Sequence, residues 1–198
     1  MEEECWGVLT KQKIEHFLFL FTKQFGKPIH SKRLSFSFWD HKRNEIDTRI
    51  RITDGKAEIM QKIGKWEKTH KWVRSEQRVR LSADSQEIFN AYKILRALFP
   101  EENVCHIMQY DNYIFKQDKF EIKLTHQSGK TDNYNFEVEA NNKDMDLDGL
   151  LEDLGLSKLM TITSVEFWDK WNEQLNLKDT DLSNEQIGDL IKKYLTLV

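Results

Sequence analysis

Hydrophobic residues make up 39% of this 198-residue chain and charged residues 32%, an ordinary balance for a domain large enough to bury a core. The net charge of −3 argues against a general nucleic-acid coat protein, and no apolar run approaches the ~20 residues that span a bilayer. With only 2 prolines and no internal repeat, the sequence predicts one domain over 1–198. Its core is expected over about 30–160, followed by C-terminal helices over 161–198.

The first predicted element is a helix, in which apolar residues recur at helical spacing: Ile14, Phe17, Leu18, Phe21 and Phe25. Gly26 and Pro28 end this helix. Strand-like segments follow at Arg33 to Trp39, Arg49 to Thr53, Ala57 to Ile63 and Trp66 to Leu81, the last as one long strand or two short ones. The Asp54-Gly55 pair between the second and third segments predicts a hairpin turn.

A second helix is predicted over about 84–99, where Pro100 stops it. Three more strands are expected at about 104–115, 119–126 and 133–140. The chain then closes with helices: one ends at Gly155, and two begin after residue pairs spaced as capping boxes, Thr163 with Glu166 and Ser183 with Gln186.

Charge is unevenly distributed along the chain. Residues 32–80 hold 14 Lys or Arg against 7 Asp or Glu, whereas residues 141–189 hold 4 against 12. The basic half should therefore carry any anion site, and the acidic half is interpreted as a solvated surface.

Nearly every predicted strand alternates charged with apolar residues, so that one face is charged and the other apolar. In an ordinary sheet, the charged face lies in solvent. Here the number of charged faces and the amphipathic helices favour another fold. We predict an α+β protein with an antiparallel closed or nearly closed β-barrel, whose charged interior is a tunnel and whose apolar outside is wrapped by helices.

Two of these strands carry paired groups of like charge. Glu137 and Glu139 share one face of a strand, and Arg49 and Arg51 share one face of another, because residues two apart in a strand point the same way. Paired acids and paired bases inside a barrel indicate a polar interior that holds an anion and a metal.

The order of elements resembles the CYTH superfamily, also called triphosphate tunnel metalloenzymes. The matching pieces surround the middle helix: Thr48-Arg49-Ile50-Arg51, Glu58 to Lys62, the strand from Arg74 to Arg80, Phe136-Glu137-Val138-Glu139 and the Leu154-Gly155-Leu156 helix end. The resemblance covers about residues 30–160. It implies a tunnel in which arginines and lysines bind a triphosphate and glutamates hold Mg²⁺ or Mn²⁺.

Carried over by position, the resemblance implies a set of substrate-binding residues: Arg49, Arg51, Lys62, Arg74, Arg78, Arg80 and Lys123. The catalytic residues would be Glu137, Glu139 and Lys62. The metal ligands would be Glu137 and Glu139, with Glu76 either a third ligand or a group that orients an arginine.

The sequence departs from the family pattern in its first strand. The family has E-x-E-x-K there, whereas the early match here, Glu2 to Trp6, lacks the lysine. If the first strand is instead Arg33 to Trp39, Ser35 and Ser37 occupy the acidic positions. The strand after the middle helix lacks the family's basic pair, and Lys119, Glu121 and Lys123 stand where an aspartate is common.

These features indicate a metal-dependent phosphohydrolase that acts on inorganic triphosphate, a nucleoside triphosphate or a similar substrate, with cyclisation of ATP a weaker reading. The alternative is a catalytically degenerate module that binds a polyphosphate, a nucleotide or an RNA 5′ end. Lys65 to Arg74 interleaves bases with aromatic residues, which fits either an RNA-binding surface or an exposed hairpin.

The sequence also predicts a location and an assembly. The start, Met1 to Glu4, lacks the basic region of a signal peptide, so we expect a cytoplasmic protein without a membrane partner. The oligomeric state is left open between a monomer and a homodimer.

Overall fold

A computed structural model describes residues 2–39, 46–64, 71–99, 104–140 and 145–197. Its strands are β1 Glu2–Leu9, β2 Ile29–Trp39, β3 Ile46–Thr53, β4 Lys56–Ile63, β5 Lys71–Arg80, β6 Cys105–Lys116, β7 Phe120–Ser128, β8 Asn133–Ala140 and β9 Leu177–Lys178. Its α-helices are α1 Lys11–Phe25, α2 Ser85–Leu98, α3 Leu147–Asp153, α4 Val165–Leu175 and α5 Asn184–Thr196.

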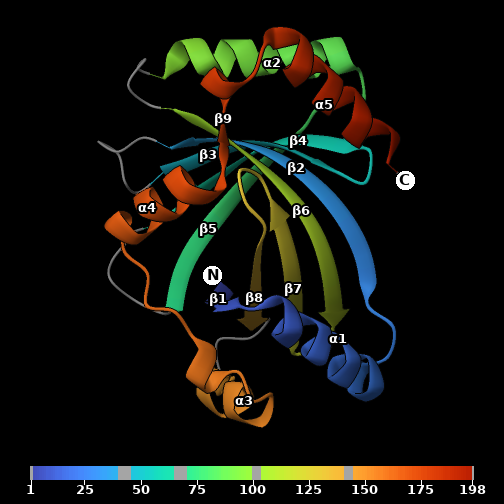
Figure 1. Cartoon of the computed structure of the whole chain (residues 1–198), viewed down its shortest axis with the longest axis vertical. Coiled ribbons are helices and arrows are strands. Elements are labelled where there is room, and N and C mark those ends of the chain that lie inside the picture. Colours follow the sequence, from blue (N-terminus) through green and yellow to red (C-terminus); the bar gives the residue numbers. More distant parts are fainter. Residues whose placement is uncertain (1, 40–45, 65–70, 100–103, 141–144, 198) are drawn as a thin grey trace.

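All strand pairings are antiparallel, in the order β2-β3-β4-β5-β1-β8-β7-β6-β9. In addition, β2 pairs with β6 over ten residue pairs, from Ile29 opposite Ile114 to Phe38 opposite Cys105. Figure 1 shows the long strands β2 and β6 strongly curved. The predicted closure into a barrel stays a prediction. The predicted antiparallel α+β class is confirmed.

The helices cover the apolar face of the sheet on two opposite sides (Figure 1). On one side, α2 and α5 pack on buried residues such as Phe36, Ile50 and Ile107. On the other, α1 and α3 pack on Phe115 and Phe136. Because side chains alternate along each strand, covering the apolar face outside directs the charged residues inward.

The first strand corrects the prediction that the chain begins with a helix. Residues 2–9 form β1, which pairs with β5 on one side and with β8 on the other. Glutamates are poor strand formers, so local propensity does not reveal β1, and its pairing with distant strands determines its structure. Gly7 is required there: an added Cβ would lie 2.2 Å from the Leu159 carbonyl oxygen and 2.4 Å from a Phe136 ring carbon.

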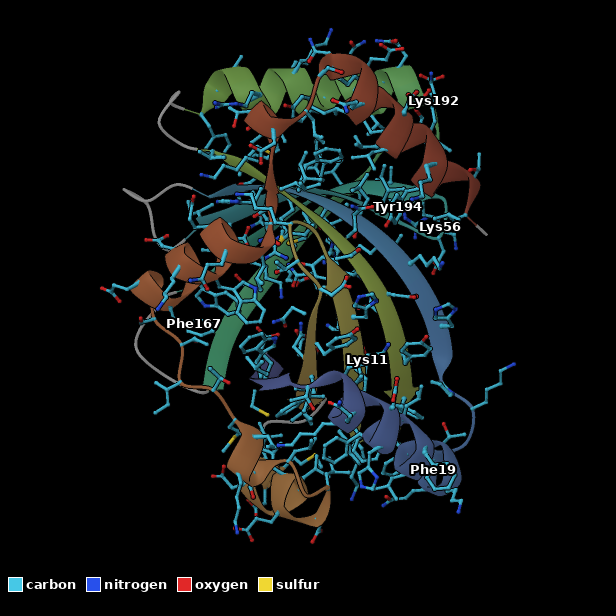
Figure 2. The ribbon with its side chains drawn as sticks, in the orientation of Figure 1. Lys11, Phe19, Lys56, Phe167, Lys192 and Tyr194 are labelled. Carbon is cyan, nitrogen blue, oxygen red and sulfur yellow. The ribbon has the colours of Figure 1, made fainter. Side chains whose placement is uncertain are left out.

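The C-terminal helices confirm one predicted cap and correct the other. Ser183 accepts a hydrogen bond from the Gln186 amide, and the Gln186 side chain accepts one from the Ser183 amide, as the capping box predicts. For α4 the prediction of Thr163 is wrong, because Ser164 accepts from the Phe167 amide. Figure 2 shows Tyr194 on the sheet side of α5, where its hydroxyl donates to Gln109 Oε1 over 3.3 Å.

Two expectations concern membranes and RNA. Within the described residues, every helix is too short or too polar to cross a bilayer. Of the base-and-aromatic segment from Lys65 to Arg74, residues 65–70 lie outside the part that the structure describes.

Candidate functional site

The inner face of the sheet lines a cavity of about 490 Å³. Every strand from β1 to β8 contributes to its lining, and α4 contributes residues as well. The charged lining residues are Arg33, Arg49, Arg51, Lys62, Arg78, Lys116, Lys123, Glu4, Glu76, Glu121, Glu137 and Glu139. The predicted charged interior is therefore a feature of the structure, and it contains both a cluster of cations and a cluster of carboxylates.

Arg49 on β3 is held by a bidentate ion pair with Asp47, two residues earlier on the same strand. Its Nε lies 2.9 Å and its Nη2 2.5 Å from Asp47 Oδ2. Asp47 is fully buried and also accepts a hydrogen bond from the Ser37 hydroxyl. Burial acts to lower the pKa of Arg49, but the Asp47 carboxylate outweighs it and raises that pKa overall. Arg49 is thus a fixed, permanently charged group in the cavity wall.

Arg51, the next inward residue of β3, is buried and lies near the charges of Arg33 and Arg49. Its Nη2 is 2.7 Å from Glu58 Oε1 and 4.0 Å from Glu76 Oε2. Burial and the charge of Arg33 lower the pKa of Arg51 to about 10, despite the two glutamates. The protonated guanidinium is therefore destabilised here, and a bound anion would relieve that penalty.

Glu76 on β5 lies between the cations of neighbouring strands. Lys62 Nζ is 3.0 Å from its carboxylate, and Arg78 donates to it through Nε over 2.9 Å. Burial acts to raise the pKa of Glu76, but Lys62 and Arg78 lower it to about 2. Glu76 is therefore ionised at neutral pH, and its oxygens orient these two side chains.

Three carboxylates come together on the neighbouring strands β1 and β8. One oxygen from each of Glu4, Glu137 and Glu139 lies within 4.8 Å of the others. The strand register accounts for this, because Glu4 lies opposite Glu139, and Trp6 lies opposite Glu137. Carboxylate oxygens are the ligands that Mg²⁺ and Mn²⁺ prefer, so the donor set fits a hard divalent cation.

A lysine from the next strand contacts this acidic group. Lys123 lies opposite Glu137 in the β7–β8 ladder, and its Nζ donates to Glu137 Oε1. In the first strand Trp6 stands where the family pattern has lysine. The cavity thus has a lysine beside its carboxylates, supplied by β7 rather than by β1.

Most of the predicted site residues line this cavity: Arg49, Arg51, Lys62, Arg78, Lys123, Glu76, Glu137 and Glu139. Arg80 is exposed and lies outside the lining, whereas Arg74 lies on β5 with a side chain outside the described part of the structure. Sequence reasoning missed Glu4 as a third carboxylate and Asp47 as the partner of Arg49. The sequence did contain a signal for Asp47, because it lies two residues before Arg49 and therefore on the same strand face as Arg49 and Arg51.

No protein-family model and no curated protein matches this sequence. Solved structures do match its fold. A Pyrococcus horikoshii protein has a TM-score of 0.63 and 14% identity, over 84% of this chain and 99% of that chain. A Bacillus halodurans protein described as a candidate adenylate cyclase has a TM-score of 0.56 and 14% identity, over 84% of this chain and 95% of that chain.

A Hippeastrum protein, described as having a dominant triphosphatase activity, matches with a TM-score of 0.53 and 14% identity, over 79% of this chain and 89% of that chain. At such identities these similarities establish a shared fold. The chain therefore shares the fold of these three proteins, and this agrees with the fold that the predicted resemblance implies.

Proposed function

We propose that the cavity binds a triphosphate group and that the protein, with Mg²⁺ or Mn²⁺, hydrolyses it. The substrate is inorganic triphosphate, a nucleoside triphosphate or a similar molecule. One observation carries this proposal: in a single cavity, cations on β3, β4 and β5 lie with a group of three carboxylates on β1 and β8. The additional β2–β6 pairing supports the view that the strands surround this cavity as a tunnel.

The basic residues supply the phosphate site. The guanidinium groups of Arg49 and Arg51 match phosphate oxygens bidentately, and Lys62 and Arg78 add two further charges. The lowered pKa of Arg51 supports this assignment, because a nearby anion would stabilise its protonated form. We assign Glu76 to orienting Lys62 and Arg78 rather than to a metal, since those cations already contact its carboxylate.

The acidic residues supply the cation site. Glu4, Glu137 and Glu139 would hold Mg²⁺ or Mn²⁺, which when bound neutralises phosphate charge and lowers the pKa of a coordinated water. In the reaction, water attacks the terminal phosphorus while the bond to the bridging oxygen breaks. Orthophosphate and the diphosphate part of the substrate are released, and the proton of the attacking water passes to solvent. Negative charge that develops on the bridging oxygen would be stabilised by Arg51 and Lys62, so positioning and electrostatics supply most of the catalysis.

One observation favours a second function, which is binding of a triphosphate without turnover. Lys123 donates to Glu137, so part of the charge of the acidic group is already neutralised by the protein. A cavity of this kind could bind a polyphosphate, a nucleotide or an RNA 5′ end and hold a metal too weakly for catalysis.

Phosphate release distinguishes the two functions. Inorganic triphosphate and ATP would each be incubated with Mg²⁺, with Mn²⁺, or with EDTA, using the wild-type protein and Glu139→Gln. The control variant is Glu15→Gln on the exposed side of α1. Metal-dependent release that Glu139→Gln abolishes and Glu15→Gln retains supports hydrolysis. Release that survives Glu139→Gln contradicts the metal assignment, and binding without release supports the second function.

A further inference from the structure

We propose that the cavity also contains a subsite for a planar aromatic group, formed by Trp6, Trp168 and Trp171. The subsite would make a nucleoside triphosphate a better ligand than inorganic triphosphate. This inference rests on the proposed function for the triphosphate part of the ligand. It assigns a role to α4, whose residues take no part in the phosphate or metal sites.

The three indole rings form one cluster in the cavity wall. Trp6 comes from β1, and its ring centroid lies 5.1 Å from that of Trp168 and 5.0 Å from that of Trp171, both on α4. The Trp6 and Trp171 planes meet at 82°, and the Trp168 and Trp171 planes at 79°. In such edge-to-face arrangements at least one ring keeps a face uncovered by its partner, so the cluster can offer a surface for stacking.

The cluster is separate from the two main apolar clusters, although Trp6 itself is buried beneath α4. The two buried clusters that hold the helices to the sheet contain none of the three tryptophans, within the described residues. All three instead line the charged cavity, where Trp168 and Trp171 remain partly exposed. Phe167 on the same helix, labelled in Figure 2, stacks on Trp171 with centroids 5.7 Å apart and supports it from within α4. Trp168 and Trp171 therefore pack on buried Trp6 and also present partly exposed aromatic surface to the cavity, where an aromatic ligand could stack.

The position of the cluster suits a ligand whose other end is a phosphate chain. Trp6 lies opposite Glu137 in the β1–β8 ladder, so the rings adjoin the proposed cation site. The lining residues further along β7 and β8 are polar but uncharged: Thr125, Gln127 and Asn135. The wall thus changes from charged residues to neutral polar ones within one cavity.

An amide on α4 gives the subsite a hydrogen-bonding group. Asn172 lines the cavity, and its Oδ1 accepts a hydrogen bond from Asn176 Nδ2 over 2.7 Å. Asn176 in turn accepts from Gln127 Nε2, which ties α4 to β7. An amide beside aromatic rings matches the donors and acceptors at the edge of a nucleobase, whereas inorganic triphosphate has no such edge. We therefore favour a nucleobase over a purely apolar ring.

Intrinsic tryptophan fluorescence tests the subsite directly. Two hydrolysis-resistant ligands, β,γ-methylene ATP and bis(methylene) triphosphate, would be titrated with Mg²⁺ into the wild-type protein, Trp171→Leu and Trp171→Phe, with Kd also measured by calorimetry. Base stacking on an aromatic side chain corresponds to roughly 5- to 150-fold in Kd. Trp171→Leu should raise the Kd of the ATP analogue by about that factor and change the Kd of bis(methylene) triphosphate by no more than about twofold. Trp171→Phe should restore most of the lost affinity for the ATP analogue. Phe19→Leu on the exposed side of α1 is the control (Figure 2).

The outcomes separate this inference from the proposed function. Quenching by the ATP analogue but not by bis(methylene) triphosphate, together with the selective loss in Trp171→Leu, supports the subsite. Equal affinities for the two ligands in the wild type and in Trp171→Leu overturn the subsite and leave the triphosphate site standing. If neither ligand binds the wild-type protein, the triphosphate site fails and the subsite fails with it.

Discussion

Replacement of Glu76 by glutamine tests whether this carboxylate stabilises the fold through its contacts with Lys62 and Arg78. Its pKa falls from the ordinary 4.5 to about 2 in the folded protein. One pKa unit corresponds to about 1.4 kcal/mol, so the fall from 4.5 to about 2 sets a ceiling of about 3.5 kcal/mol on the stabilisation. Solvent screening and the coupling among these charges reduce that value. We expect Glu76→Gln to lower the free energy of unfolding by about 1–3 kcal/mol at pH 7.

The sign of the pH dependence follows from the lowered pKa. Stabilisation by Glu76 is complete above about pH 4.5 and is lost as the pH falls through about 2. Urea unfolding at pH 7 and at pH 2.5 would measure this, with Glu15→Gln as the matched control. The difference in the free energy of unfolding between the wild type and Glu76→Gln should be smaller at pH 2.5 than at pH 7. A difference that is equal at both pH values, or absent at pH 7, would refute the proposed role of Glu76.

Three further predictions concern the anion site, the cation site and the first strand. Arg51→Ala should weaken triphosphate binding by about 10- to 100-fold in calorimetry, because it removes charge-assisted hydrogen bonds; an unchanged Kd would contradict the assignment. Lys123→Gln should tighten Mn²⁺ binding measured by electron paramagnetic resonance, since it frees Glu137 from an internal cation, and weaker binding would argue against competition. Gly7→Ala should lower the melting temperature by several degrees, because its Cβ would clash with Leu159 and Phe136, whereas Gly188→Ala on α5 meets open space and should not.

The features that could be predicted from the sequence are those that depend on the periodic spacing of residues close together in the chain. The two-residue alternation places Arg49 with Arg51 and Glu137 with Glu139 on inward faces, and all four line the cavity. The helix that forms α2 was likewise predicted, with Pro100 as its stop signal. Such patterns depend on a few neighbouring residues, so they can be read without knowledge of the fold.

The features that were missed arise from pairing between distant segments. Glu4 becomes a third carboxylate because β1 pairs with β8, more than a hundred residues away in the chain. Trp168 and Trp171 reach the cavity because α4 packs against Trp6 of that same strand. Local propensity predicts neither contact. The glutamates of β1 are poor strand formers, so the sequence did not predict the strand on which both features depend.

The most direct measurement is the anomalous scattering of Mn²⁺ in crystals grown with bis(methylene) triphosphate. We predict a manganese peak within coordination distance of Glu4, Glu137 and Glu139, with phosphate oxygens against Arg49 and Arg51. A triphosphate bound in the cavity with no manganese peak beside those carboxylates would contradict a metal-dependent mechanism. A peak elsewhere, with the phosphates away from the arginines, would contradict the assignment of both sites.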